Sequence, residues 1–440
     1  MIDIRLIREN PEIVRENIRK KNQDTKLILV DEILEYDKEI KQIRSDAESL
    51  RHRRNILSEE INKSKKEGKD IKQLLLEVKE IPEKIKKIEE KLAHVESKIQ
   101  HNMLQIPNMM YPDVPKGKDA SENVEIRRGG HIRKFDFPIK THIELSESLD
   151  IASWDASAKV AGTGFYYLKN DLALLNQALI RFTIDFMHGK HYEYIEPPLM
   201  LNEKTIYASM DKTAIEQSVY SIKDEDLNLI GTSEQAVLAM HANETIPESE
   251  LPKKYFSYSM CFRKEIGAHG INEKGLWRTH QFNKVEQFIF CRPEDSEKYY
   301  DELLDNSEKI LQALELPYRV IEICTGDLAD WKYRSADLEV WRPTINEYGE
   351  VMSLSNCTEY QARKLNIKCA DKNGNKRTLH TLNDTALATS RIMVAILENN
   401  QNVDGSVTIP KALVPFMHGR TVIEKRSKYQ AAFREQGQPE

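Results

Sequence analysis

Cysteine is scarce in this sequence, with five residues among 440: Cys261, Cys291, Cys324, Cys357 and Cys369. Their number is odd, their spacings are wide, and no Cys-x-x-Cys pair occurs. This pattern argues against a disulfide framework and against a thiolate zinc site. Reduced thiols are typical of the cytoplasm, so we expect a cytoplasmic protein.

The glycine motifs of common nucleotide-binding folds are also missing. No Gly-x-Gly-x-x-Gly follows an expected strand. Gly270 and Gly275 have the spacing of a P-loop, but Leu276 and Trp277 follow where Lys and Ser or Thr are required. No nucleophile elbow with Ser, His and Asp is visible either. An ATP site in this chain would therefore have to be built on an antiparallel sheet.

Long apolar runs and an excess of positive charge are the remaining absences. No run of about 18 apolar residues occurs, and the start MIDIRLIREN lacks the apolar part of a signal peptide, so we expect neither a membrane span nor a signal peptide. With 65 Lys and Arg against 71 Asp and Glu, the formal net charge is −6. Any contact with nucleic acid therefore has to come from a local basic patch. A chain of 440 residues is long enough for two or three domains.

Heptad spacing is the first positive signal. Apolar residues recur at steps of three and four in two runs, with Gly68 between them. They are Ile33, Tyr36, Ile40, Ile43, Ala47, Leu50, Leu57, Ile61, Ile71, Leu74, Val78, Ile81, Ile85, Ile88, Leu92, Val95 and Ile99. Two such runs around a glycine predict an antiparallel helical hairpin, at about 27–103 of an N-terminal domain 1–106. Pro82 interrupts the second run without shifting its register, which predicts a local bend and not a helix end.

Basic residues gather in the half of this hairpin nearest its turn. They are Arg51, Arg53, Arg54, Lys63, Lys65, Lys66, Lys69 and Lys72. A basic helical rod suits contact with the backbone of a nucleic acid. The same residues suit an ordinary solvated coiled-coil surface or an arm that binds a protein partner, and the pattern by itself leaves these alternatives open.

Proline and glycine mark the next boundary. Residues 107–130 hold three prolines and end in Gly-Gly, which predicts a linker. We expect a globular α+β domain at 131–420 and a charged, Gln-rich tail at 421–440 that frays. Patterns within the domain predict a helix at 172–187, a strand that Pro197 ends, and a strand at 350–357. Asn383-Asp384 is typical of a turn, and it precedes a predicted helix with Arg391 in its second turn.

The stretch from Cys261 to Phe290 predicts two strands joined by a loop, of which we expect 268–274 to be mobile. Alternation of side chains puts Arg263 and Glu265 on one face of the first strand. It puts four residues on one face of the second: His280, Phe282, Lys284 and Glu286. Charges on a sheet face are costly unless they pair with each other or with a ligand. A solvated face is the alternative, but the flanking aromatic residues favour a covered sheet and hence a ligand site.

Three segments resemble the motifs of class II aminoacyl-tRNA synthetases: the helix and strand ending at Pro197-Pro198, residues 262–286, and the segment ending at Arg391. With the hairpin, and with Gly231-Thr232-Ser233-Glu234, the resemblance is to the seryl-tRNA synthetase family and covers essentially the whole chain. Thr232 alone would also be explained as the N-cap of a helix. The signature motifs of class I synthetases are absent.

The resemblance implies an antiparallel sheet core flanked by helices, preceded by a coiled-coil arm, in a homodimer. It implies that L-serine is activated with ATP and Mg²⁺ to seryl-adenylate. The seryl group would then pass to the 3′ end of tRNA(Ser), held by the arm, and to that of tRNA(Sec) where the cell has one. The pattern is similar to the common zinc-free type of the family, with a third motif like that of archaeal members.

The resemblance also implies roles for individual residues. The catalytic residues would be Arg263, Glu265 and Arg391. ATP would be bound by Arg263, Lys264, Glu265, Thr279, Phe282, Glu350, Val351, Met352, Ser353 and Arg391, with Glu350 and Ser353 holding Mg²⁺. L-Serine would be bound by Thr232, Ser233, Glu234, Arg263, Glu286, Asn383 and Thr385. The eight basic residues of the hairpin would contact tRNA, while His280 and Lys284 receive no role.

One departure from the family pattern concerns the serine site. Many bacterial members have Asn-Gly-Ser where this chain has Asn383-Asp384-Thr385, and threonine keeps the hydroxyl while adding a methyl group. Two other functions fit parts of the sequence. A synthetase-like enzyme that loads a carrier protein would lack the long hairpin. A catalytically inactive coiled-coil adaptor would not need the charged residues of the motifs.

Overall fold

The computed structural model describes residues 1–210, 212–266 and 274–425. The chain forms two compact units, Met1–Met109 and Met110–Glu440. The expectation of a mobile loop at 268–274 lies outside the described residues except at Lys274, and that of a fraying tail at 421–440 except at 421–425. Within this described part of the tail, Val422–Ile423 is a strand paired with Val407–Thr408. In the described part, no helix is both long enough and apolar enough to cross a membrane.

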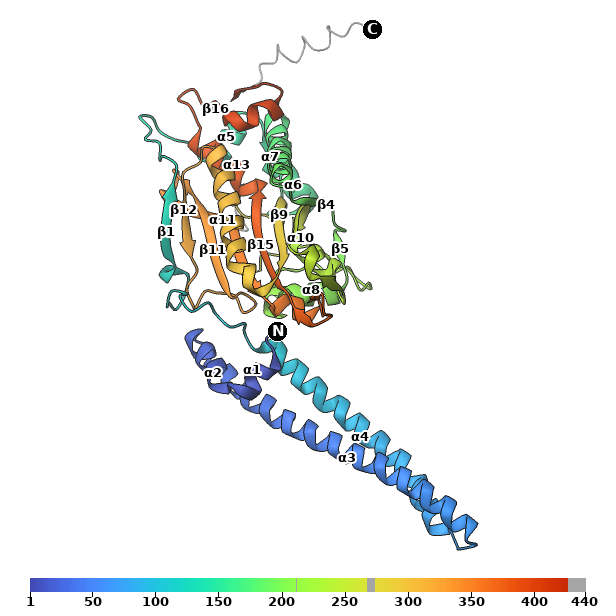
Figure 1. Cartoon of the computed structure of the whole chain (residues 1–440). Coiled ribbons are helices and arrows are strands. Elements are labelled where there is room, and N and C mark those ends of the chain that lie inside the picture. The colour runs from blue at the N-terminus through green and yellow to red at the C-terminus, as the bar shows by residue number, and fades with distance from the viewer. Residues whose placement is uncertain (211, 267–273, 426–440) are drawn as a thin grey trace. The chain divides into compact units, whose positions relative to one another are not determined.

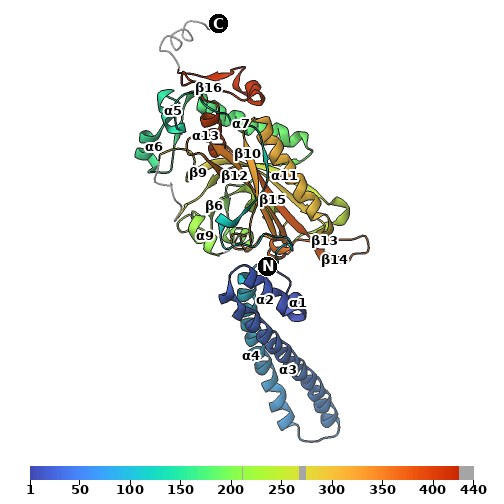
Figure 2. The ribbon, with the colours of Figure 1, turned by 90° about the vertical axis from the view of Figure 1, so that its left-hand side faces the viewer.

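The first unit is helical. It consists of α1 (Ile4–Glu9), α2 (Pro11–Lys20), the 3₁₀ turn η1 (Asp24–Lys26), α3 (Leu27–Lys66) and α4 (Lys72–Gln105). α3 and α4 run side by side in opposite directions (Figure 1, Figure 2) and form the hairpin arm that the heptad spacing predicts. Gly68 turns the chain between them at a φ of +69°, a conformation that glycine adopts without strain.

An apolar seam holds the hairpin arm together. Ten of the predicted heptad positions are buried: Ile33, Ile40, Ile43, Ala47, Leu57, Ile61, Ile81, Ile85, Val95 and Ile99. Val30 of α3 and Met103 of α4, which lie outside the predicted set, are buried as well. Pro82 lies inside α4 and the helix continues past it, so the expectation that it does not end the helix is confirmed. Ion pairs cross from one helix to the other on the arm surface: Arg44–Glu96, Arg51–Glu89 and Arg53–Glu77.

The second unit is built on one large sheet. Among the described residues the sheet has eight strands, in the order β1 (Val124–Gly129), β10 (Tyr318–Glu322), β11 (Arg334–Arg342), β12 (Glu347–Thr358), β15 (His380–Ala388), β9 (Gln281–Cys291), β8 (Lys253–Phe262) and β4 (Glu193–Ile195). β4 and β8 are parallel, and the other neighbouring strands are antiparallel. The predicted α+β fold with an antiparallel core is confirmed.

Helices and short strand pairs complete this unit. The helices are α5 (His142–Ser148), α6 (Trp154–Ala161), α7 (Asn170–Gly189), α8 (Glu203–Ser209), α9 (Lys212–Ser218), α10 (Ser233–Met240), α11 (Ser296–Ala313), α12 (Tyr360–Lys364) and α13 (Thr389–Asn399). The short strands are β2 (Ala152–Ser153) with β3 (Tyr167–Leu168), β5 (Met200–Leu201) with β6 (Asn228–Leu229), β7 (Thr245–Pro247) with β13 (Lys368–Ala370) and β14 (Lys376–Thr378), and β16 (Val407–Thr408) with β17 (Val422–Ile423).

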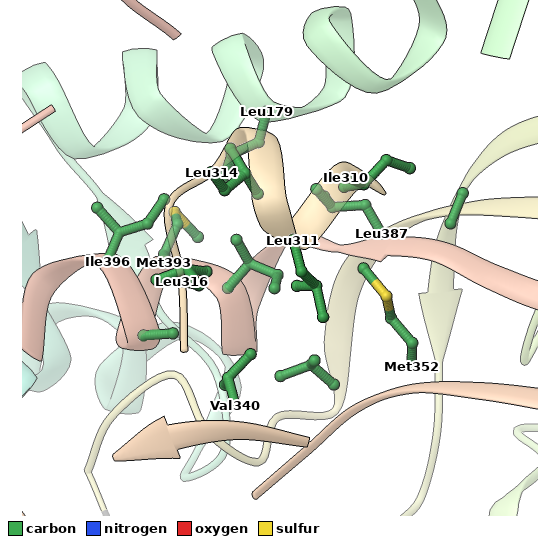
Figure 3. Close-up of a cluster of buried hydrophobic side chains, with 14 of the residues drawn as sticks. Leu179, Ile310, Leu311, Leu314, Leu316, Val340, Met352, Leu387, Met393 and Ile396 are labelled. Atoms are coloured by element: carbon green, nitrogen blue, oxygen red, sulfur yellow. The ribbon is translucent and has the colours of Figure 1, made fainter. Parts of the chain in front are cut away.

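An apolar core lies between one face of the sheet and the helices α7, α11 and α13. Figure 3 shows Leu179 of α7, Leu311 of α11, Met393 of α13 and Met352 of β12 among the side chains of this core. Val285 of β9 enters the same core. Because side chains alternate along a strand, the neighbours of Val285 point toward the opposite face of the sheet. That opposite face carries the candidate site.

The segment expected to be a linker, 107–130, contributes to the second unit. Its residues 124–129 form β1, which pairs with β10 at the edge of the sheet. Val114 is buried against Ile321, and the backbone N–H of Tyr111 donates to the carbonyl of Tyr333 at 2.9 Å. The prolines of this segment are evident in the sequence and predicted a linker. The strand β1 was missed because it is an exposed edge strand with no buried face.

The turn expected at Asn383-Asp384 was wrong. Both residues lie inside β15, which is hydrogen-bonded to β12 on one side and to β9 on the other. Pairing on both sides overrides the local preference of Asn and Asp for turns. As a consequence α13 begins only at Thr389, and Arg391 lies in its first turn and not in its second.

Candidate active site

A cavity of about 570 Å³ opens on the sheet face opposite the apolar core, within the size range of small-molecule sites. It brings together most of the site residues predicted from the sequence: Thr232, Glu234, Arg263, Glu265, Thr279, Phe282, Glu286, Glu350, Val351, Ser353, Asn383, Thr385 and Arg391. These come from strands β9, β12 and β15, from the starts of α10 and α13, and from the segment after β8. Residues up to about 160 positions apart in the sequence therefore line the same cavity.

Three predicted site residues are not among the described residues that line the cavity: Ser233, Lys264 and Met352. The hydroxyl of Ser233 donates to the carbonyl of Ser257 at 3.5 Å, and the side chain is fully buried. Met352 packs into the apolar core (Figure 3) because it points to the other face of β12. The backbone N–H of Lys264 donates to the carbonyl of Ser218 at 2.9 Å.

One end of the cavity holds a buried ion pair between Lys284 and Glu286. Their side chains are only 9% and 2% exposed, and burying one charge without the other would be costly. The Lys284 ammonium also donates to Thr232 Oγ1 at 3.3 Å. Thr385 lies opposite Glu286 in the ladder between β15 and β9. A carboxylate and a hydroxyl thus face each other across a strand pair beside an ammonium group.

Glu234 is the second carboxylate at this end. It is the second residue of α10, whose N-cap is Thr232, and the backbone N–H of Glu234 donates to Thr232 Oγ1 at 3.4 Å. The N-cap interpretation of Thr232 is therefore confirmed. The amides of Asn383 and Gln361 both donate to Glu234 Oε1, at 3.1 and 2.7 Å. Burial, together with the nearby charge of Glu286, raises the pKa of Glu234 to about 7.

Arg263 and Glu265 do not share a strand face, contrary to the prediction from alternation. β8 ends at Phe262, and Glu265 has a φ of +52°, so the chain has left the sheet by that point. Arg263 Nε donates to the carbonyl of Gly231 at 3.1 Å, and its guanidinium lies 5.3 Å from the centre of the Phe282 ring. Arg278 Nη1 donates to Glu265 Oε2 at 2.6 Å. Both residues nevertheless line the cavity.

His280, which had no role from the sequence, holds the backbone at Arg263. Its Nδ1 lies 2.9 Å from the Arg263 carbonyl and 3.0 Å from the hydroxyl of Tyr220. Its backbone N–H donates to the carbonyl of Gly164 at 2.9 Å, and its carbonyl accepts from the Arg263 N–H at 3.0 Å. His280 therefore joins the two ends of the segment between β8 and β9.

Arg391 connects α13 to the segment between β8 and β9. Its Nε donates to the carbonyl of Trp277 at 3.2 Å, and its Nη1 donates to the carbonyl of Glu350 at 2.6 Å. The guanidinium groups of Arg391 and Arg342 lie 5.3 and 4.1 Å from the Trp277 ring. A Cβ atom at Gly349 would come within 2.3 Å of the same ring, so a glycine is required there. These contacts hold Trp277 at the cavity wall.

A histidine outside the cavity anchors the residues that lead to Trp277. His142 Nδ1 lies 2.9 Å from Glu398 Oε1, and the backbone N–H of Leu276 donates to His142 Nε2 at 3.3 Å. This pair of contacts requires the neutral tautomer with its hydrogen on Nδ1. A Cβ atom at Gly275 would lie 2.5 Å from His142 Nε2, so this approach also needs glycine.

Glu350 and Ser353, which the family resemblance implies as ligands of Mg²⁺, both line the cavity and present oxygen atoms of the kind that Mg²⁺ prefers. Burial alone would raise the pKa of Glu350, but the Arg391 guanidinium and the Lys332 ammonium outweigh it and keep the pKa below its usual value. Lys332 Nζ donates to Ser353 Oγ at 3.3 Å. Nearby Asp337 has a buried Oδ1 without a hydrogen-bond partner in the described structure, and burial with the charge of Glu350 raises its pKa to about 7.

The donor set fits a magnesium ion that is shared with a ligand. Magnesium is usually held by one or two carboxylates together with water and substrate phosphates. Among the described residues there is no cluster of three or more His, Cys, Asp or Glu that would bind a metal by itself. Glu350 and Ser353 both line the cavity and suit a metal ion that arrives with phosphate groups.

Several cavity residues were missed from the sequence. Trp277 and Arg278 line the cavity beside the predicted Thr279, and Lys332 and Lys284 supply ammonium groups to it. Alternation on β9 carried a signal for Lys284, because it lies between Phe282 and Glu286 on one face. Lys332 belongs to no motif and reaches the site from the segment before β11, so no local pattern could have revealed it.

Two sequence families match the chain. The sequence model for "tRNA synthetase class II core domain (G, H, P, S and T)" matches residues 218–400, which contain most of the cavity residues. The model for "Seryl-tRNA synthetase N-terminal domain" matches residues 1–110, the range of the helical first unit.

Individual proteins match over nearly the whole chain. A serine–tRNA ligase of Methanocella arvoryzae is 46% identical, covering 95% of this chain and 99% of its own. The crystal structure of seryl-tRNA synthetase from Pyrococcus horikoshii complexed with ATP has a TM-score of 0.93 at 40% identity, covering 97% of this chain and all of its own. The cytoplasmic serine–tRNA ligase from Naegleria fowleri in complex with AMP has a TM-score of 0.87 at 34% identity, covering 97% and 99%.

Proposed function

Because the chain belongs to the seryl-tRNA synthetase family, we propose that its cavity binds L-serine beside ATP and joins them as seryl-adenylate, from which the seryl group passes to tRNA. One observation carries the assignment of the cavity. The cavity is lined by Glu286 together with Thr385, by Glu234 and by Arg263. They offer partners for a hydroxyl, an ammonium and a carboxylate, which are the three polar groups of serine.

Selection of serine in this proposal depends on Glu286. Its carboxylate and the Thr385 hydroxyl receive the hydroxyl of serine, while Glu234 receives the ammonium. Alanine lacks the hydroxyl and leaves a buried carboxylate with an unfilled hydrogen-bonding position, which a polar site rejects strongly. The methyl group of threonine has to be excluded by the walls of the enclosure.

The first chemical step needs no general base. An oxygen of the serine carboxylate forms a bond to the α-phosphorus of ATP, and the bond from that phosphorus to the oxygen bridging to the β-phosphate breaks, releasing pyrophosphate. The carboxylate is already ionised, so the protein contributes position and charge. Arg263 binds the serine carboxylate and the α-phosphate together, for which a forked guanidinium is suited.

ATP is held by both ends in this proposal. Phe282 stacks on adenine and Glu265 contacts its edge, with Thr279 and the backbone of residues 350–353 and 264 around it. Arg278 and Arg391 line the same cavity and supply positive charge for the outer phosphates. Glu350 and Ser353 hold Mg²⁺, which neutralises phosphate charge when bound.

The second step transfers the seryl group. A ribose hydroxyl of the terminal adenosine of tRNA attacks the carbonyl carbon of seryl-adenylate, and AMP leaves. We assign tRNA binding to the N-terminal domain 1–106 through its arm, catalysis to 131–420, and the tRNA partners to tRNA(Ser) and, where present, tRNA(Sec). All the basic arm residues predicted for this contact except Arg53 are exposed, which supports the assignment.

The proposal places the protein in the cytoplasm as a homodimer. Five buried free cysteines are compatible with a reducing compartment. The mass of the particle by light scattering tests the dimer: we expect twice the chain mass of 51.1 kDa. A particle of one chain mass at micromolar concentration contradicts it.

Amino-acid-dependent exchange between pyrophosphate and ATP tests the proposed function. With each of the twenty amino acids supplied in turn, we expect exchange with serine and a rate lower by roughly 10⁴-fold with alanine. Transfer of serine to tRNA(Ser) is then measured against transfer to an acyl carrier protein. Exchange that prefers another amino acid, or transfer to the carrier alone, contradicts the proposal.

A further inference from the structure

Gln361 is a fully buried residue of α12 that belongs to none of the segments resembling synthetase motifs. Its Nε2 donates to Glu234 Oε1 at 2.7 Å, and its Oε1 accepts from the Thr381 hydroxyl at 2.8 Å. The same Nε2 lies 3.4 Å from the carbonyl of Ser209. Only the NH₂ end of an amide donates to a carboxylate or a carbonyl, so Glu234 and Ser209 fix which way the amide is turned, and the Thr381 hydroxyl holds the oxygen at its other end.

Two amides converge on one oxygen of Glu234. Asn383 Nδ2 donates to Oε1 at 3.1 Å, and Gln361 Nε2 donates to the same atom. Among the described residues, Oε2 is thus the oxygen left for a ligand. A glutamate side chain in the first turn of a helix has several rotamers, and holding it in one of them in advance lowers the cost of binding.

The hydrogen bond from Gln361 also favours the charged form of Glu234. Burial and the Glu286 carboxylate oppose ionisation of Glu234, whereas the Gln361 amide and the ammonium groups of Lys284 and Lys332 favour it. An ammonium ligand is attracted more strongly by the ionised carboxylate than by the neutral acid. A residue that keeps this group ionised therefore contributes to binding without touching the ligand.

We propose that Gln361, held by Thr381, is a positioning residue for the amino acid substrate: it aims Glu234 at the α-ammonium group. This rests on the proposed function, in which Glu234 binds the ammonium group of serine. The contacts of Gln361 with Glu234 and Thr381, and its complete burial, carry the inference.

Substitution Gln361→Met, which preserves the approximate size, tests the proposal in the full-length protein. A hydrogen bond to a charged group is lost, so we expect the KM for serine in pyrophosphate exchange to rise roughly 10- to 100-fold. The ammonium interaction is made equally in the ground state and the transition state, so kcat and the KM for ATP should change less than about threefold.

Gln401→Met provides a matched control. Gln401 is 1% exposed, and in the part of the chain that the structure describes its amide bonds to backbone groups. It donates to the carbonyls of Lys140 and Glu398 at 2.9 and 3.0 Å and accepts from the N–H of Lys140 at 2.8 Å. Its loss carries the general cost of removing a buried amide. An equal rise in serine KM in both variants overturns the positioning role.

Thr381→Val is a second variant, milder than the first, because it removes the hydroxyl that holds the Gln361 oxygen while keeping the shape. We expect a serine KM about 3- to 10-fold higher. If Gln361→Met does not fold, this variant decides the question by itself: an unchanged serine KM overturns the proposal.

The pH dependence of serine KM separates positioning from a merely structural role. With a pKa of about 7, Glu234 is charged above neutral pH, so serine KM of the unmodified protein should rise as pH falls below about 7. The groups facing Glu234 are Lys284 and Glu286 of β9, Lys332 before β11 and Cys357 of β12. Loss of the Gln361 hydrogen bond raises the pKa further, so in Gln361→Met the rise should begin at a higher pH.

Glu234→Gln distinguishes failure of this inference from failure of the proposed function. If Glu234→Gln raises serine KM and Gln361→Met does not, Glu234 binds the substrate and Gln361 has no positioning role. If Glu234→Gln leaves serine KM unchanged, the assignment of Glu234 fails, and with it both the proposed site and this inference.

Discussion

The hairpin arm and the cavity both carry many charged side chains, but in opposite surroundings. In the arm, the ion pair Arg51–Glu89 joins side chains that are 51% and 55% exposed. In the cavity, Lys284 and Glu286 are 9% and 2% exposed. A solvated ion pair is easily exchanged for contacts with a partner, whereas a buried pair costs several kcal/mol to break.

This difference teaches what each set of charges can do. Charges of the arm stay available to a large polyanion without any rearrangement of the helices. In the cavity, the ion pair Lys284–Glu286 is already matched within the protein, and a ligand has to extend that match group by group. The first arrangement favours affinity that depends on salt, and the second favours chemical selectivity.

Removal of the arm should have the largest effect, and it tests whether the arm and the cavity have separate roles. Deletion of 33–99, with a short Gly-Ser turn in its place, should abolish serine transfer to tRNA because the phosphate contacts go with the arm. Pyrophosphate exchange should stay within about threefold, because the cavity residues all lie in the second unit. Unchanged aminoacylation by the truncated protein would show that the arm has no part in tRNA recognition.

Removal of a cavity carboxylate should have the next largest effect. Glu286→Ala leaves the Lys284 ammonium buried without its partner and removes the group proposed to receive the serine hydroxyl. We expect serine-dependent exchange to fall by roughly 10²- to 10³-fold or more, while ATP binding measured by calorimetry persists.

The arm carboxylate Glu89 is the matched control for this change. Glu89→Ala removes an exposed partner of Arg51 and should leave exchange unaltered. Exchange at the original rate in Glu286→Ala would contradict the placement of serine in the cavity.

A substitution in the apolar seam tests what stabilises the arm. Leu57 is fully buried in the seam, and Leu57→Ala should destabilise the arm by about 2–5 kcal/mol. Circular dichroism at the helical minimum during heating should report an earlier arm transition. Leu76→Ala, at a side chain that is 64% exposed in α4, is the control and should shift the transition little. Equal shifts would mean that the seam is not the source of arm stability.

The smallest expected effect is that of an arm ion pair on stability. Arg51→Ala should leave the midpoint of arm unfolding within about 1 °C, because an exposed pair contributes little. Its effect should instead appear as weaker tRNA binding in a filter assay and as a shallower dependence of that binding on salt. A large fall in the midpoint with unchanged tRNA binding would assign Arg51 to structure.

The arm was predicted from the sequence better than the cavity was, because the arm is formed by contacts between residues at regular, short spacings along the chain. Heptads identified its seam and Gly68 its turn. Strand alternation correctly grouped Phe282, Lys284 and Glu286, which all line the cavity from β9. It was wrong for His280, which was assigned to the same strand but lies before the start of β9. The same rule failed for Arg263 and Glu265, because the chain leaves the sheet after Phe262.

Residues that contact the site residues from distant segments could not be predicted from the sequence. Gln361 and Lys332 meet the site from segments that carry no motif, and each is brought there by the pairing of β11, β12 and β15. His142 reaches Leu276 across 134 positions of the chain. Such contacts arise only when the sheet has closed, so no local pattern records them.

Local patterns in the sequence predicted the helical arm and the α+β class, because periodicity is a local property, whereas most cavity residues were predicted from the resemblance of the motifs to a known family. Tertiary structure alone decided which of those residues face the cavity, that Asn383 and Asp384 lie in a strand between two others, and that Gln361 holds Glu234. The physical reason is that burial and pairing across the sheet change what a polar side chain costs and where it can point. Neither the energetic cost of a polar side chain nor its direction is set by the residue itself or by its neighbours along the chain.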